Sequence, residues 1–191
     1  MRSFREKELR RNHRYREAEQ FAQDYEPIKG RSYQWVYEDA VRAFNRATDA
    51  INTLDRKAEG MIKYVTPGTG LFGLAFAILA QAFDVSMYAG VLVAIGIAGL
   101  LASIISCLLS LCPHQQTLTP SVHRALQCAD YEEYDSEQAI GLFTTGIGWA
   151  TVGKIILTDI KATYLRFAYR SFTAGLVLIF AGLCWTLLAL C

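Results

Sequence analysis

Three stretches of the sequence are almost purely apolar and contain no Asp, Glu, Lys or Arg. They are residues 64–83, 88–112 and 172–191. Because a helix needs about 20 apolar residues to cross a hydrocarbon core of about 30 Å, we expect three transmembrane helices. The first two are separated only by residues 84–87, so they should form a tight antiparallel hairpin. The predicted fold class is an all-α integral membrane protein, with a hairpin, a C-terminal span and cytoplasmic amphipathic helices.

An amphipathic stretch precedes both the first and the third span. Residues 37–62 repeat apolar side chains every three or four positions, which predicts a helix that runs unbroken toward the first span. We expect Pro67 in the first turn of that span, where proline is tolerated. A second helix is predicted from Ser136 to Arg170, continuing into the third span. Its glycine-rich part, residues 139–153, is short for a span, and we expect it to pack against the other cytoplasmic helix.

The polar part of the chain begins with a charged stretch that is suited to a helix and is closed by a break at residues 27–30. Together with the spans, it gives five predicted segments. They are a charged N-terminal cytoplasmic helix (1–30), an amphipathic cytoplasmic helix (31–63), a transmembrane hairpin (64–112), a cytoplasmic helical region (113–171) and a third span (172–191).

The basic residues predict the orientation of the chain in the membrane. Of the 19 Lys and Arg residues, 14 precede the first span and five lie between the second and third spans. Lys and Arg are retained in the cytoplasm, so a multi-pass membrane protein with its N-terminus inside and its C-terminus outside is expected. The net charge of +1 argues against nucleic acid as a partner.

The sequence contains few residues that could serve catalysis, transport or metal binding. The spans carry no ionisable residue in the bilayer interior, which argues against proton-coupled or ion-coupled transport. The three histidines have no Glu or Cys partner at a recognisable spacing, and the five cysteines form no CxxC pair. A GxGxxG match at residues 68–73 lies inside a predicted span, where the dinucleotide-binding context is missing. We therefore expect no enzyme activity, no catalytic residue, no metal site and no cofactor.

Small and polar residues in the spans are candidates for helix packing. Gln81 is the one strongly polar side chain in a span, either as an interhelical or interfacial amide or as a pore-lining group. Small residues allow helix backbones to approach closely in lipid. They can serve packing within one chain or association of several chains. The predicted packing residues are Ala98, Ala102, Ser106 and Ser110 in the second span, and Gly175, Gly182 and Ala189 in the third.

Similar charged motifs precede the first and third spans. Asp55 and Lys57 lie in one, and Asp159 and Lys161 lie in the other. An acid and a base two positions apart on a helix point in different directions. They can remain solvated or contact lipid headgroups. Alternatively, Asp55 pairs with Lys161 and Lys57 with Asp159, which would fix the register of the two helices and act as a latch.

The order of these elements resembles a known family. An amphipathic helix with an Asp-x-Lys-Ala motif (Asp55, Lys57, Ala58) leads into a hairpin that ends in a Leu-x-x-Ser-Leu-x-Pro-like stretch, residues 108–113. The chain from residue 37 onward resembles the transmembrane effectors of the Pycsar cyclic-nucleotide antiphage systems. It is also similar to the related SLATT-like two-transmembrane effectors of bacterial conflict systems.

The resemblance implies a bacterial inner-membrane antiphage effector that is inert until infection, then oligomerises and impairs the membrane. Its partners would be the lipid bilayer, further copies of the chain and a soluble sensor protein, because residues 1–36 are too short for a cyclic-nucleotide-binding domain. The alternative hypothesis is a non-enzymatic anchor or adaptor that docks a soluble partner through its charged N-terminal helix.

Overall fold

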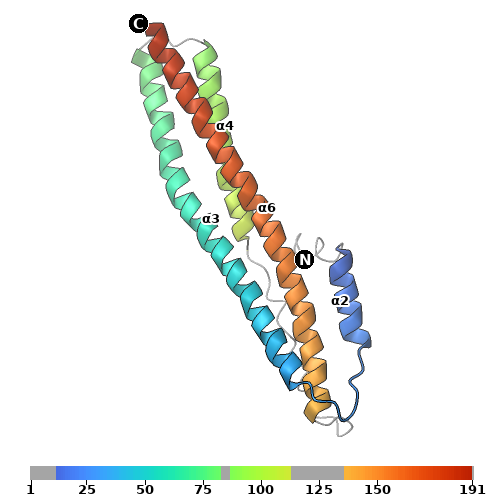
Figure 1. The fold of residues 1–191 in the computed structure, drawn as a ribbon. Coiled ribbons are helices and arrows are strands. Elements are labelled where there is room, and N and C mark those ends of the chain that lie inside the picture. Colours follow the sequence, from blue (N-terminus) through green and yellow to red (C-terminus); the bar gives the residue numbers. More distant parts are fainter. Residues whose placement is uncertain (1–11, 83–86, 113–135, 191) are drawn as a thin grey trace. The chain divides into compact units, whose positions relative to one another are not determined.

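The computed structural model describes residues 12–82, 87–112 and 136–190, and all of the secondary structure in them is α-helical. Helices α3, α4 and α6 are each long and apolar enough to cross a membrane, as the three apolar stretches predicted. The residues of the predicted 84–87 turn lie outside the described part, apart from Met87. The four helices are α2 (His13–Asp24), α3 (Gln34–Ala82), α4 (Met87–Leu111) and α6 (Ser136–Leu190) (Figure 1).

The chain forms two compact units, and both α3 and α6 contribute to each of them. The first comprises Met1–Thr53 and Pro113–Asp159, and the second comprises Leu54–Cys112 and Ile160–Cys191. The last residues of the predicted cytoplasmic helices, 54–63 and 160–171, therefore pack with the spans. We call these parts the first unit and the second unit.

Helix α3 runs without interruption from the amphipathic stretch into the first span, as predicted. The expectation for Pro67 was wrong in one respect, because this residue lies inside α3 and not in a first turn. Proline there has no N–H to donate to the carbonyl of Lys63, and its ring crowds that carbonyl. The helix is nevertheless continuous: the Thr69 hydroxyl donates to the Val65 carbonyl at 2.8 Å, and Val65 is buried.

In the first unit, α2 begins at an Asn12 cap, whose side chain accepts a hydrogen bond from the backbone N–H of Arg14 at 3.0 Å. The Tyr15 ring of α2 is buried and lies 5.7 Å from the Trp149 ring of α6. The predicted break after α2 is present, and Gly30 adopts a positive φ of 76° that suits glycine. Helix α2 thus packs onto the chain's own α6 through one buried face.

In this unit the glycine-rich part of α6 packs against α3, as predicted, and also against the segment that joins α2 to α3. Its Phe143 ring lies 5.9 Å from the Tyr37 ring of α3, which is the expected contact. Gly141 faces the segment that joins α2 to α3, because a Cβ there would come within 3.2 Å of Pro27 and Tyr33. The backbone N–H of Tyr33 also donates to the Glu137 carboxylate at 3.0 Å.

The second unit has an apolar core shared by α3, α4 and α6. Ala58, Leu100 and Leu165 are among its buried residues. Helix α4 runs antiparallel to α6 and buries residues at alternating steps of four and three, the spacing of a coiled-coil seam. The seam consists of Ala89, Val93, Gly96, Leu100, Ser103, Cys107 and Ser110.

Candidate functional site

An ion pair joins α3 to α6 in the second unit. The Lys161 ammonium donates a hydrogen bond to Oδ1 of Asp55. The Lys161 side chain is only 4% exposed, whereas that of Asp55 is 30% exposed. The structure therefore brings together one of the two residue pairs that the paired motifs suggested.

Burial makes this pair energetically sensitive. An ammonium group loses its hydration when it leaves water, and only a close counter-charge compensates the loss. Lys161 lies one turn from Leu165 on α6, and Asp55 lies three residues before Ala58 on α3, so both charges adjoin the apolar core. Separation of α3 from α6 at this point would leave the lysine charge without a partner in apolar surroundings.

The other predicted pair is placed differently. Both Lys57 and Asp159 are exposed to solvent. Their pairing across the two helices remains a prediction, and the candidate latch rests on Asp55 and Lys161 alone.

A second lysine of α6 faces α3 in the first unit. Lys154 Nζ donates to Thr48 Oγ1 at 2.6 Å and lies 3.7 Å from the centroid of the Phe44 ring. The Thr48 hydroxyl in turn donates to the Phe44 carbonyl at 2.8 Å. Desolvation by burial lowers the pKa of Lys154, and within the described residues this lysine has no carboxylate partner.

Sequence reasoning counted Lys154 only as one basic charge. The signal that was missed is a shared spacing, because Lys154 and Lys161 are seven residues apart, as are Thr48 and Asp55. Each lysine contacts the α3 residue 106 positions earlier in the chain. A seven-residue repeat keeps side chains on one face of a helix that packs along a parallel neighbour.

Glycines bring α4 and α6 into backbone contact in the second unit. A Cβ on Gly175 would lie 2.7 Å from the Gly96 carbonyl oxygen, and one on Gly96 would lie 2.8 Å from the Gly175 carbonyl oxygen. Likewise, a Cβ on Gly182 would lie 2.7 Å from Val93 Cγ2. Gly175 and Gly182 of the predicted stripe thus pack within the chain, while Ala189 belongs to α6 and its side chain is outside the described set.

The predicted stripe of α4 is only partly buried. Ser106 and Ser110 are buried, Ala102 is half-buried and Ala98 is exposed. The difference arises because a strict four-residue step drifts around a helix of 3.6 residues per turn, whereas alternating steps of four and three stay on one face. Ala98 therefore lies away from the seam.

The seam of α4 carries hydroxyl groups in its second half. Beside the seam, the buried Ser106 Oγ donates to the Ala102 carbonyl at 2.7 Å. Ser103 and Ser110 are fully buried, and their hydroxyls have no hydrogen-bond partner in the described part of the chain. Buried hydroxyls without a partner are uncommon and are costly in an apolar environment.

The remaining candidates do not converge on a site. The Gln81 side chain is exposed on α3, and His13 of α2 pairs with Glu17 at 3.0 Å on the surface. His114 and His123 lie outside the described residues. Among residues 12–82, 87–112 and 136–190, no cluster of His, Cys, Asp and Glu could hold a metal ion.

Three membrane-capable helices in an all-helical chain define a multi-pass membrane protein. The Pycsar effector protein domain family matches residues 39–188, and the chain belongs to this family. The protein is therefore an antiphage membrane effector, and its domain is a transmembrane effector domain, not one of a known enzyme family. No curated protein and no solved structure matched the chain.

Proposed function

We propose that this effector assembles into an oligomer in the bacterial inner membrane when infection triggers it, and that the assembly impairs the bilayer. The distribution of basic residues supports an N-terminus in the cytoplasm and a C-terminus outside. The trigger would act on the cytoplasmic parts of α3 and α6, because the same two helices continue as the first and third spans.

The observation that carries the proposal is a contrast between the glycines of the spans. Gly96, Gly175 and Gly182 meet α4 or α6 atoms at close range, whereas Gly70 and Gly73 of α3 have nothing within 4 Å. Close approach of helices in lipid depends on such residues. The open glycines of α3 suit contact with a helix from a further copy of the chain.

The serine hydroxyls of α4 support impairment of the bilayer. Ser103 and Ser110 are buried and have no partner among the residues that the structure describes, which favours any rearrangement that supplies one. Water entering a separated helix bundle would hydrogen-bond to these hydroxyls. We infer that this half of the seam lines the leak once the helices move apart.

The Asp55–Lys161 pair is the proposed latch of the resting state. Its ammonium is buried and paired only while α3 and α6 are in register. We expect D55N to depolarise cells without infection, because the variant leaves the Lys161 charge uncompensated. D49N is the matched control, since Asp49 is exposed on the same helix and forms no ion pair in the described residues.

The central test follows membrane potential with a dye in cells that express the full chain with its neighbouring genes. After phage infection we expect depolarisation at the time of growth arrest, together with a crosslinked ladder of oligomers. A G70L/G73L variant should lose both, because leucine blocks the open face of α3, whereas G60L, outside the apolar stretch, should keep both. Growth arrest with an intact potential would contradict the proposal.

The adaptor hypothesis predicts a different pattern. An adaptor would show neither depolarisation nor oligomers, and deletion of residues 1–30 would release a bound soluble protein. For the proposed effector, D55N should still depolarise the membrane when residues 1–30 are absent. This comparison separates the two functions in one strain background.

A further inference from the structure

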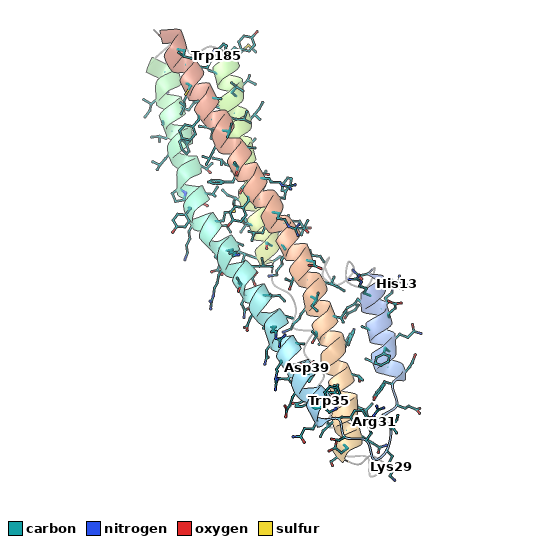
Figure 2. The ribbon with its side chains drawn as sticks, viewed as in Figure 1. His13, Lys29, Arg31, Trp35, Asp39 and Trp185 are labelled. Carbon is teal, nitrogen blue, oxygen red and sulfur yellow. The ribbon has the colours of Figure 1, made fainter. Side chains whose placement is uncertain are left out.

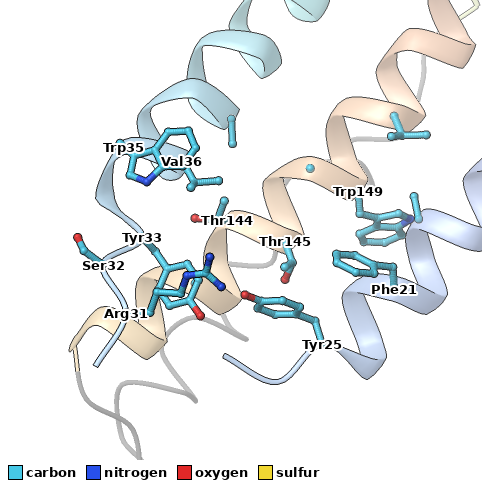
Figure 3. A pocket seen from close by; sticks show the side chains of 15 residues that line it. Phe21, Tyr25, Arg31, Ser32, Tyr33, Trp35, Val36, Thr144, Thr145 and Trp149 are labelled. Atoms are coloured by element: carbon cyan, nitrogen blue, oxygen red, sulfur yellow. The ribbon is translucent and has the colours of Figure 1, made fainter. Parts of the chain in front are cut away.

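The first unit contains an open pocket of about 570 Å³ with aromatic walls (Figure 3). Helix α2, the segment that joins it to α3, the start of α3 and the glycine-rich part of α6 all contribute to its lining. The aromatic rings are those of Phe21, Tyr25, Tyr33, Trp35 and Trp149. Ligand pockets of this kind are mostly apolar and hold a few polar groups that orient the ligand.

Glycines create part of this space. Gly148 lines the pocket, and a Cβ built on it would meet nothing within 4 Å. No neighbouring atom excludes a larger side chain at this position, so the space beside the aromatic rings is open because residue 148 is glycine. The glycine-rich part of α6 therefore leaves the pocket open at Gly148.

Among the described residues that line the pocket, the Arg31 guanidinium is the single charged group, and none of them is a carboxylate. In the described part of the chain Arg31 makes no ion pair. Figure 3 shows its guanidinium directed toward the hydroxyl of Tyr25. The pKa of Tyr25 is raised, first by its side-chain hydrogen bond with Tyr33 and then by burial, so the phenol remains a neutral donor at neutral pH.

We propose that this pocket binds a small planar aromatic anion. The rings supply flat apolar faces for stacking. Arginine forms paired hydrogen bonds with carboxylate, sulfonate or phosphate oxygens, and the Thr145 hydroxyl is a further polar group of the lining. A cation is disfavoured because the only charge among the described lining residues is positive, whereas an anion would give the exposed Arg31 a counter-charge that these residues do not supply.

The tryptophans of the chain make the proposal measurable. Of the three tryptophans in the sequence, Trp35 and Trp149 line the pocket, and Trp185 lies near the C-terminal end of α6 (Figure 2). In the full-length W185F variant, all tryptophan fluorescence therefore comes from the pocket. Binding can be followed in detergent on the purified chain, independently of whether it assembles or depolarises a membrane.

The experiment titrates W185F with 4-nitrobenzenesulfonate, a planar aromatic anion whose nitro group quenches indole fluorescence. The matched control ligand is 4-nitrobenzenesulfonamide, which has the same ring and is neutral at pH 7. Free N-acetyltryptophanamide provides the correction for collisional quenching and absorption. We expect saturable quenching by the anion, with an affinity at least about tenfold higher than that of the neutral control, as expected for one charge-assisted contact.

Two variants in the W185F background locate the site. R31Q should reduce the affinity for the anion to that for the sulfonamide. G148L should abolish saturable quenching because leucine fills the pocket, whereas G146L should bind normally. Gly146 has equally open surroundings and does not line the pocket, so this control carries the same change of residue type.

Three results would overturn the proposal. The first is quenching that rises linearly, as it does for the free indole. The second is equal affinity for the sulfonate and the sulfonamide, which would make the pocket a general apolar surface that detergent, lipid or another copy of the chain can cover. The third is an unchanged affinity of R31Q or G148L, with circular dichroism showing that the variant is folded.

Discussion

The two lysines that α6 presents to α3 are stabilised in different ways. Lys161 has a carboxylate counter-charge, whereas Lys154 has a hydroxyl oxygen and the face of an aromatic ring. A carboxylate compensates lost hydration far better than a neutral oxygen does. Replacement of Asp55, the partner of Lys161, should therefore lower the stability of the fold, whereas replacement of Lys154 should raise it.

Removal of the counter-charge should destabilise the resting fold. D55N should cost about 3 kcal/mol, the lower end of the range for breaking a buried pair, because Asp55 keeps some contact with water. For a chain of this length the loss corresponds to a fall in Tm of about 5–10 °C. Thermal unfolding in detergent, followed by circular dichroism, measures it, and D49N should unfold like the wild type. Equal Tm values for all three chains would show that the pair contributes nothing.

The charge of Lys154 should make stability depend on pH. Burial lowers its pKa below the ordinary lysine value of 10.5, so between the two values the unfolded chain binds more protons than the folded one. The charged Lys154 destabilises the folded chain fully at any pH below its lowered pKa. This destabilisation disappears as the pH rises past the ordinary lysine pKa of 10.5. K154M should therefore be more stable than the wild type at pH 8, and this advantage should shrink toward pH 10.5. A difference in stability between K154M and the wild type that stays constant from pH 8 to pH 10.5 would show that the Lys154 charge is not the cause.

At the scale of elements, helices α4 and α6 are held together by the close fit of small residues at their contact. The contacts between α4 and α6 include glycine against backbone at Gly96 and Gly175, and backbone atoms cannot move aside as a flexible side chain can. The seam of α4 contains few large side chains because the helix axes lie close together there. The outer faces, in contrast, carry leucine, isoleucine and valine, which suit contact with hydrocarbon.

Enlargement of one glycine in this contact should separate the two helices. G96L places new atoms where Ile179 and the Gly175 carbonyl lie, and should cost about 3 kcal/mol as severe overpacking. G68L is the matched control in α3, because a Cβ there meets nothing within 4 Å. Unfolding in detergent should show a lower Tm for G96L and an unchanged or higher Tm for G68L. The reverse order would mean that α4 and α6 do not pack through these glycines.

At the scale of the whole molecule, the number of crossings determines on which side each end lies. Three crossings place the two termini on opposite sides, and all 19 basic residues then lie on the N-terminal side. Alkaline phosphatase fused after Cys191 should be active, because it folds only outside the cytoplasm. A fluorescent reporter fused before Met1 should be bright. An inactive phosphatase in a stably expressed fusion would exclude the proposed topology.

The sequence by itself determined the helical class, the three membrane-capable stretches and the continuity of the preceding amphipathic helices with two of them. These features depend on local physics, namely apolar length and helical periodicity. The Asp55–Lys161 pair was also within reach, because two similar motifs precede two spans. Even so, only the packing of α6 against α3 shows that the two charges form a pair in which the lysine is buried and not solvated.

Only the tertiary structure decided which faces meet. It placed the seam of α4 at alternating steps, with Ala98 outside it, and brought Thr48 to Lys154 and Gly96 to Gly175. It also formed an aromatic pocket from α2, α3 and α6, although no local motif marks those rings as neighbours. The physical reason is that burial and pairing depend on residues about one hundred positions apart in the chain, which a local pattern does not encode.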